Sequence, residues 1–256
     1  MNSRLVALGS CGAWPEAGRA CSGFVLEHDG FRVVIDLGYG TLPRLLELLG
    51  SSIAEGIDAV IVSHKHPDHM VDLHGLFRAR WFGMPSASAL PLFAPAGVVE
   101  RLKGLEEDDA SGIDRVFDWH PLPGSAYELG PFRLESWLLP HFVPNAGVRL
   151  SADGLTVAYT GDTGPDSGLA ELGRDADLFI VEASDRNQRE PSAPTGPQMH
   201  LTARQAGEAA AAADAHRLLL THFWPENDRE LSRASAGEVY GGEVLLATEG
   251  LRMALA

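Results

Sequence analysis

The chain has 256 residues and a formal net charge of −15, from 35 acidic and 20 basic side chains. It is 45% hydrophobic and 21% charged, as globular proteins are, which excludes wholesale disorder. Long nucleic acids are bound through clustered Lys and Arg, and the only lysines are Lys65 and Lys103, so a polymeric nucleic-acid substrate is disfavoured.

The cysteines and the apolar runs bear on the cellular setting. Cys11 and Cys21 are too few for a disulfide scaffold or a zinc–thiolate site, which favours a reduced compartment. No run of 18 apolar residues exists, so no membrane span is expected, and the first apolar run is too short for a signal peptide. We therefore expect a cytoplasmic protein. Without repeats, linkers or composition breaks, residues 1–256 are expected to form a single domain.

The first half of the chain is predicted to alternate short strands with helices. Asp29-Gly30 is a hairpin signal, and Thr41 and Pro43 mark a helix start, with Thr41 as the cap. The expected strands are 5–8, 23–26, 31–35, 58–62 and 91–93, and the expected helices are 41–49, 69–82 and 96–105.

The second half is richer in predicted strands. Thr202 and Gln205 form a capping-box pattern before an alanine-rich helix at 206–213, and another helix is expected near 167–172. The Pro-rich segment 185–198 is predicted to be a loop, either a lid or a surface connection. The expected strands are 132–139, 147–150, 155–159, 178–181 and 217–220, with 244–247 and 252–255 paired as a terminal hairpin. Two strand series separated by helices predict an α/β fold of two packed sheets with helices outside.

The segment from Ser63 to His69 carries the strongest functional signal. His64, His66, Asp68 and His69 fall within six residues, directly after an apolar strand. Imidazole and carboxylate are good ligands for zinc and related divalent ions. Without a metal, these polar groups would be crowded and poorly satisfied, so we expect a metal site here.

Three later residues follow the same order of apolar strand, ligand-type side chain and loop. They are His141, Asp162 and His222. They could complete a site for two adjacent ions. The more isolated histidines are expected to be core or solvated residues; they are His28, His74, His120 and His216.

The ordered pattern His-x-His-x-Asp-His, His, Asp, His resembles the metallo-β-lactamase fold superfamily, and the likeness covers essentially the whole chain. The resemblance implies an αββα sandwich, with two mixed sheets flanked by helices and a two-metal site at one edge. It implies that one ion is held by His64, His66 and His141, the other by Asp68, His69 and His222, and both by Asp162. It also implies that Asp36, in the motif 34–40, orients the first loop.

Glu182 and His200 resemble the Glu–His pair of the phosphodiesterase branch that contains ribonuclease Z. In that branch the His contacts phosphate and protonates the leaving oxygen, and the Glu orients the His. Asp68 or Asp162 could aim the attacking water. The metals are expected to be Zn²⁺, with Mn²⁺ or Fe²⁺ also suited to these ligands. Arg149 could contact phosphate or form a structural ion pair.

The chain lacks the flexible basic arm with which ribonuclease Z grips precursor tRNA, and segments 72–77 and 158–164 resemble small bacterial cyclic-nucleotide phosphodiesterases. We therefore expect a hydrolase of a small phosphodiester such as a cyclic nucleotide, with no membrane or long nucleic-acid partner and, by resemblance, a homodimer. Trp81, Phe82 and Met84 could form an apolar substrate wall or belong to the core. The alternatives are tRNA 3′ processing, lactone, ester or thioester hydrolysis on the same fold, and a metal-binding module without turnover.

Overall fold

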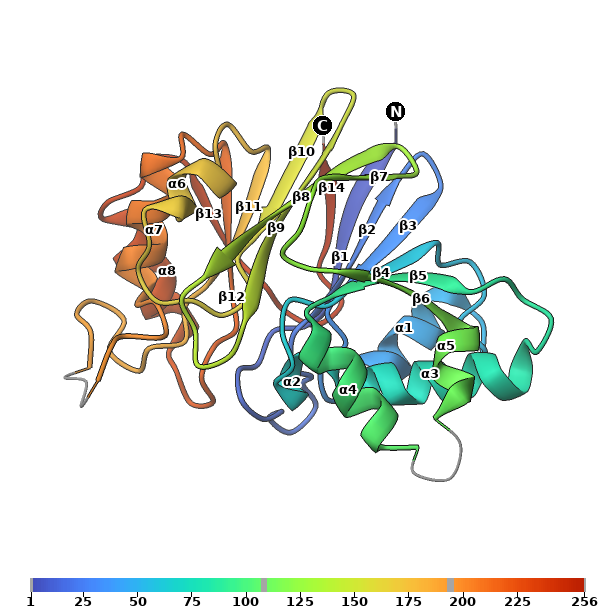
Figure 1. Ribbon diagram of the computed structural model, residues 1–256. Coiled ribbons are helices and arrows are strands. Elements are labelled where there is room, and N and C mark those ends of the chain that lie inside the picture. The colour runs from blue at the N-terminus through green and yellow to red at the C-terminus, as the bar shows by residue number, and fades with distance from the viewer. Residues whose placement is uncertain (1, 107–109, 193–195, 256) are drawn as a thin grey trace.

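The computed structural model describes residues 2–106, 110–192 and 196–255, whose strands form two seven-stranded sheets (Figure 1). The strands are β1 (Ser3–Gly9), β2 (Gly23–His28), β3 (Phe31–Ile35), β4 (Ala59–Ile61), β5 (Leu90–Ala94), β6 (Phe117–Pro121), β7 (Tyr127–Leu129), β8 (Phe132–Leu139), β9 (Asn145–Ala152), β10 (Leu155–Tyr159), β11 (Leu178–Glu182), β12 (Arg217–Thr221), β13 (Glu243–Leu246) and β14 (Arg252–Leu255). The helices are α1 (Thr41–Leu49), α2 (Pro67–Met70), α3 (Asp72–Gly83), α4 (Ala96–Gly104), α5 (Ser111–Val116), α6 (Gly168–Leu172), α7 (Ala203–Ala212) and α8 (Arg229–Gly237).

Both sheets are mixed. The first has the strand order β14-β1-β2-β3-β4-β5-β6, antiparallel up to β3 and parallel from β3 to β6. The second has the order β13-β12-β11-β10-β9-β8-β7, parallel from β10 to β13 and antiparallel elsewhere. Helices α1, α3, α4 and α5 flank the first sheet, and α6, α7 and α8 flank the second (Figure 1). The predicted α/β fold of two mixed sheets flanked by helices is confirmed.

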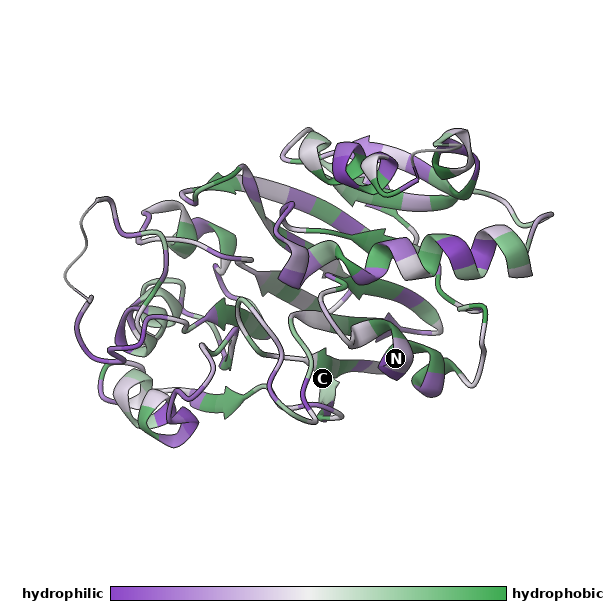
Figure 2. Cartoon of the chain, turned by 90° about the horizontal axis from the view of Figure 1, so that it is seen from below, coloured by the Kyte–Doolittle hydropathy of each residue, from purple (hydrophilic) through white to green (hydrophobic). Residues whose placement is uncertain are grey.

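Three apolar layers hold this arrangement together. The central layer joins the facing sides of the two sheets, with Phe24 and Tyr159 in edge-to-face contact across it. The second layer packs the first sheet against its helices, and the third packs the other sheet against α6, α7 and α8. Several central strands are hydrophobic along most of their length in Figure 2, as expected for strands covered on both faces. Within the described ranges, no helix is long and apolar enough to cross a membrane.

The capping box at Thr202 is confirmed, because its side chain accepts from the Gln205 amide while the Gln205 side chain accepts from the Thr202 amide. The cap predicted at Thr41 is wrong. Gly40 occupies the N-cap position in a left-handed conformation, and the Thr41 hydroxyl donates to the Gly38 carbonyl. The carboxylate of Asp72 instead accepts from the Leu42 amide. A group distant in sequence therefore satisfies this helix end.

The predicted terminal hairpin is also wrong. β13 pairs in parallel with β12 at the edge of the second sheet, whereas β14 pairs antiparallel with β1 in the first sheet. The turn between them carries the chain from one sheet to the other, a change that local sequence cannot indicate. Short elements were missed altogether, namely α5, β6, β7 and α8, although Asp228 caps α8 by accepting from two of its amides.

Candidate active site

The first ligand-type segment leaves β4 and enters two short helices rather than the single predicted helix 69–82. Pro67 occupies the first turn of α2, as its fixed backbone angle favours. The Leu37 amide donates to the His69 carbonyl, and the Asp72 amide donates to the Leu37 carbonyl. These two bonds replace the ones that a continuous helix would make, which explains the break. They also tie residues 63–72, called the ligand loop from here on, to the chain that follows β3.

One group of side chains converges beyond the ends of β4, β8 and β10. The Nε2 atoms of His64 and His141 each lie 3.1 Å from the Nδ1 atom of His66. Both Nε2 atoms lie 3.8 Å from one carboxylate oxygen of Asp162. Four potential ligand atoms therefore face a common point, all within 4.8 Å of one another.

A second group lies beside the first and shares Asp162 with it. The Nε2 atom of His222, beyond β12, lies 3.1 Å from Asp68 and 3.3 Å from Asp162. The Nε2 atom of His69 lies 3.2 Å from the other oxygen of Asp162. The backbone amide of Ala13 donates to Asp68 at 2.7 Å, a contact that no pattern in the sequence indicates. All seven residues named from the sequence as ligands are thus brought together.

The donor set of these groups fits divalent cations. The Nε2 atom of His69 and the Oδ1 atom of Asp162 are buried. Although they lie 3.2 Å apart, neither has a hydrogen-bond partner among the described residues. Such atoms are costly to bury unless something else coordinates them. Burial lowers the pKa of His141 to about 4, which keeps its ring neutral and able to coordinate. Although burial opposes ionisation of Asp68, the neighbouring His69 and His222 hold the pKa of its carboxyl below the usual value.

Asp36 supports the ligand loop from the end of β3. Its carboxylate pairs with Nδ1 of His69 at 2.7 Å, leaving Nε2 of that ring to face Asp162. It also accepts hydrogen bonds from the Ser63 amide and hydroxyl and from the Tyr159 hydroxyl. Asp36 itself has a left-handed φ of 58°, a strained conformation that these contacts must maintain. Its position agrees with the predicted role of orienting the first loop.

Glu182 and His200 form a pair next to the second group. The His200 Nδ1 atom lies 3.0 Å from the fully buried Glu182 carboxylate, which also accepts from the Thr163 amide and the Ser184 hydroxyl. Burial disfavours the charged His200 ring, but the Glu182 carboxylate outweighs that effect and raises the His200 pKa to about 9. The ring stacks on His222 with centroids 5.9 Å apart. Glu182 therefore favours the protonated form of His200, whose ring faces the ligand cluster.

Glycines permit the backbone to approach this cluster closely. A Cβ on Gly38 would lie 1.9 Å from the Asp68 carbonyl oxygen, and one on Gly12 would lie 2.8 Å from the His222 ring. No side chain fits at Gly38 without displacing the loop that carries Asp68 and His69. Gly38 thus allows the motif 34–40 to pack closely against the ligand loop.

Several residues singled out from the sequence lie away from the cluster. Arg149 donates to the backbone carbonyls of Leu172 and Arg174, so its contacts are structural. Trp81 and Met84 line a different pocket at the far end of α3, and Phe82 is exposed beneath Arg78. The aromatic residues beside His200 are instead Phe142 and Trp224. Short loops carry both, without a pattern that would single them out.

The isolated histidines behave as expected, since within the described ranges none belongs to a potential metal group. His28 is buried and bonds the Ser3 hydroxyl, and His74 pairs with Glu106. His120 stacks on Phe93, and His216 is exposed beside Asp177. Both cysteines are free and buried.

Residues 20–223 match the family described as "Beta-lactamase superfamily domain". The chain belongs to this family. Its similar relatives include the uncharacterized protein ML1173 of Mycobacterium leprae, 34% identical over 96% of this chain and 87% of that protein. A ribonuclease Z of Kineococcus radiotolerans is 29% identical over 86% of this chain and 82% of that enzyme.

The crystal structure of the metallo-β-lactamase fold protein YhfI from Bacillus subtilis superposes with a TM-score of 0.85 at 26% identity. The alignment covers 99% of this chain and 100% of that one. The predicted metallo-β-lactamase fold is therefore confirmed. Among the curated proteins YhfI is described as a probable metallo-hydrolase, and together with the ribonuclease it supports a hydrolase here. The His and Asp clusters support divalent metal binding.

Proposed function

We propose that the protein is a dinuclear metal-dependent phosphodiesterase acting on a small phosphodiester, with a cyclic nucleotide as the leading candidate. The observation that carries this proposal is the shared carboxylate of Asp162, which joins two groups of potential ligands, with the Glu182–His200 pair at their edge. Two adjacent cation sites and a positioned acid are the parts that phosphodiester hydrolysis needs.

Two cation sites would divide the candidate ligands as the resemblance implies. His64, His66 and His141 would hold one ion, while Asp68, His69 and His222 would hold the other, with Asp162 contributing to both. Such ions, probed first as Zn²⁺, would supply positive charge that lowers the pKa of water and neutralises phosphate oxygens. Asp36 fixes the His69 ring so that Nε2 faces inward.

The other side chains provide orientation and a proton. The Asp68 carboxylate, held by the Ala13 amide, is placed to accept a hydrogen bond from the attacking water. His200 contacts the phosphate and donates a proton to the leaving oxygen, because Glu182 keeps its ring charged and fixes its orientation through Nδ1. Glu182 is thus a positioning residue, and His200 is the general acid.

The surroundings of His200 suit a compact substrate. A cavity of about 430 Å³ beside it is lined by Phe142, Met199 and Pro197 among others. Phe142 is 68% exposed, and Trp224 borders the adjoining space under the Arg186 guanidinium. An exposed aromatic ring such as that of Phe142 beside the proposed phosphate site favours a ligand that carries a flat base.

The test is hydrolysis of cyclic AMP and of a chromogenic phosphodiester by zinc-loaded protein, with lactone and thioester substrates run in parallel. We expect turnover of the phosphodiesters, reduced in the His200→Ala variant and unchanged in His216→Ala, which alters an exposed histidine away from the cluster. Turnover of lactones or thioesters alone would reject the proposal in favour of the other hydrolase reaction.

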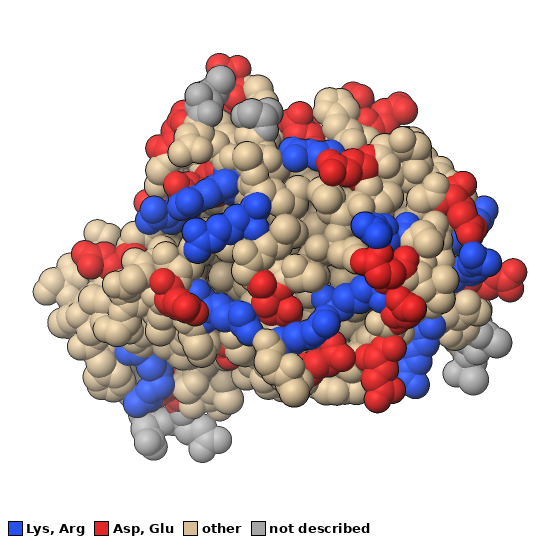
Figure 3. All heavy atoms as spheres, turned by 180° about the vertical axis from the view of Figure 1, so that it is seen from behind, with Lys and Arg blue, Asp and Glu red and all other residues tan. Residues whose placement is uncertain are grey.

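A second candidate is tRNA 3′ processing, favoured by the likeness to the Kineococcus ribonuclease Z. The net charge of −15 opposes it, and the face shown in Figure 3 mixes basic with acidic side chains rather than presenting a basic surface. Salt-sensitive binding of precursor tRNA in a gel shift, with 3′ cleavage, would support this candidate over the first.

A further inference from the structure

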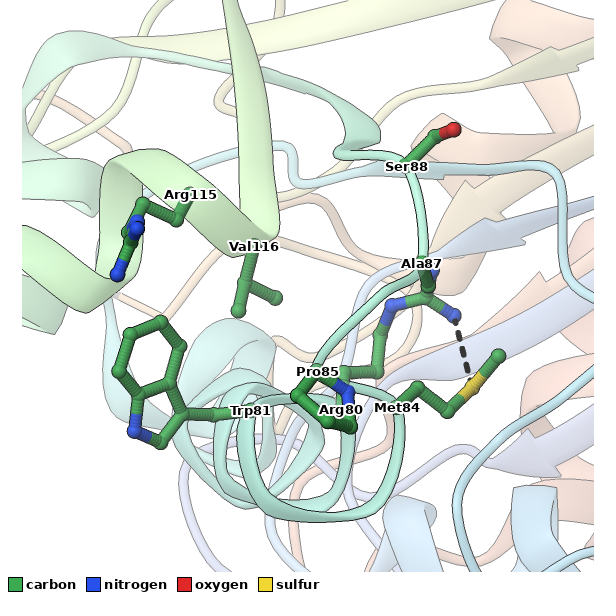
Figure 4. A pocket seen from close by; sticks show the side chains of 8 residues that line it. All are labelled: Arg80, Trp81, Met84, Pro85, Ala87, Ser88, Arg115 and Val116. Atoms are coloured by element: carbon green, nitrogen blue, oxygen red, sulfur yellow. Dashed lines mark hydrogen bonds between the residues drawn. The ribbon is translucent and has the colours of Figure 1, made fainter.

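Helix α3 leads from the ligand loop to a second pocket that the proposed reaction does not use. With 12 residues the helix is about 18 Å long, and the pocket lies beside its C-terminal end. The cavity measures about 390 Å³, within the range of small-molecule sites. Figure 4 shows Arg115, Val116 and Trp81 on one side and the 84–88 segment on the other, with Arg80 reaching up from the helix.

Within the part of the chain that the structure describes, Arg80 is a buried cation without a counter-charge. Arg80 is only 7% exposed. Its guanidinium nevertheless has only long contacts, to the Ala54 carbonyl at 3.5 Å and to the Met84 sulfur at 4.0 Å. Both distances are at the outer limit of a hydrogen bond. Burial lowers the pKa of this guanidinium, and no carboxylate of the described residues pairs with it. A buried charge normally needs a partner.

A second guanidinium faces the same pocket from α5. Gly112 lets α5 pack closely on α3, since a Cβ there would lie 3.2 Å from Phe77. One turn later, Arg115 lies over the Trp81 ring at 5.7 Å and makes no ion pair with any described residue. Its neighbour Asp114 pairs instead with Lys103. Although the chain has 35 acidic side chains, neither of the two arginines at this cavity pairs with an acid of the described residues.

We infer that this pocket binds a small organic anion in which a phosphate or carboxylate is attached to a planar ring. The planar guanidinium matches the two oxygens of either group, and binding would supply the counter-charge that Arg80 lacks. The Trp81 indole, with Val116 and Met84, offers an apolar wall to the ring. The inference concerns a site at the other end of α3 and does not depend on the proposed reaction.

The test titrates ¹⁵N-labelled, zinc-loaded protein with AMP, benzoate and adenosine while the indole N–H signals are followed by NMR. The chain has five tryptophans, and Trp81→Phe identifies the signal that reports this pocket. The signals of Trp14 and Trp224, whose rings contact each other, report the candidate active site instead, because Trp224 borders the space beside His200. Saturable shifts of the Trp81 signal are expected with AMP or benzoate, at affinities at least about tenfold above that of adenosine. AMP and benzoate distinguish a phosphate ligand from a carboxylate ligand.

Variants establish which side chains hold the anion. Arg115→Met, at an exposed position, and Arg80→Met should each weaken the anion's affinity about tenfold or more. Arg78→Met removes an exposed arginine of the same helix that pairs with Glu106, and it should bind as the unchanged protein does. A Trp81 signal that moves with neither anion, or equal affinities in Arg115→Met and Arg78→Met, would overturn the inference.

Discussion

The two ends of α3 both bury polar groups that lack partners, but with opposite charge. At the start of the helix, the Asp162 carboxylate and the ring nitrogens of His64 and His69 face one another. At its end, Arg80 is buried without an acidic partner among the described residues. The first region gathers carboxylate and imidazole atoms that suit a cation, and the second holds a guanidinium that suits an anion. Each incomplete set of contacts therefore indicates the charge of the ligand that would complete it.

The two regions also differ in how many neighbouring groups hold their side chains in place. Asp36, Glu182 and the Ala13 amide all hold ligand-type side chains in place, whereas Arg80 has only two long contacts. A site built for chemistry requires such outer support, because small displacements lower rates. We therefore expect changes at the start of α3 to affect catalysis strongly, and changes at its end to affect binding or stability.

The largest effect is expected from Asp162→Ala, because this residue belongs to both ligand groups. Metal content should fall together with activity, and turnover should drop about a thousandfold or more, since several kcal/mol of charge stabilisation would be lost. Elemental analysis and phosphodiester turnover measure the two effects. Asp153→Ala, in an exposed turn, is the control and should keep both. Full metal content in Asp162→Ala would show that the carboxylate is not a shared ligand.

The contrast between the regions explains what the sequence could predict. His64, His66, Asp68 and His69 lie within six residues, and the later candidates follow apolar strands, so residue type and order sufficed to name all seven residues that the structure brings together. Most strands were also predicted, because period and β-branched content are local properties. The pocket at Arg80 has no such signal, since α5 was not predicted and nothing in the sequence places Arg115 beside Trp81.

The errors share one physical cause, namely contacts between segments distant in sequence. Leu37 interrupts the predicted helix 69–82, and Asp72 takes the capping position predicted for Thr41. The terminal strands β13 and β14 were assigned to each other because they are neighbours in sequence, yet each completes a different sheet. Local pattern indicates that an element exists, whereas its partner is set by tertiary packing.

The next largest effect is expected from His200→Ala. If His200 acts as the acid, turnover should fall about a hundredfold to ten-thousandfold while both metals stay bound. Glu182→Gln should lower turnover less, because the amide can still hold the ring. Comparison of turnover with metal content separates the roles, since His200 lies close enough to His222 and Glu182 to be a ligand itself. Metal loss in His200→Ala would reassign it from acid to ligand.

A smaller effect, on stability, should follow from Gly38→Ala. The new methyl group would meet the Asp68 carbonyl at 1.9 Å, so the ligand loop must shift. We expect the free energy of unfolding to fall by about 1–3 kcal/mol, as in other overpacked sites, with weaker metal binding. Gly104→Ala adds the same methyl group at the end of α4, where nothing lies within 4 Å; it should leave metal binding unchanged and should not lower the free energy of unfolding, because alanine favours a helix. Equal stability of the two variants would show that the loop adapts freely.

The smallest expected effect is the difference in the free energy of unfolding between the Arg149→Met and Arg80→Met variants. This difference is also the sharpest test of the second region. Arg149 donates to two backbone carbonyls, whose loss should lower the free energy of unfolding by about 1–2 kcal/mol. Arg80 has only long contacts, so an apolar side chain of similar length should cost less than about 1 kcal/mol or even stabilise the protein. Urea unfolding without added anions measures both. A larger loss at Arg80 than at Arg149 would mean that its contacts with Ala54 and Met84 are structural, and that the charge at the end of α3 serves the fold rather than a ligand.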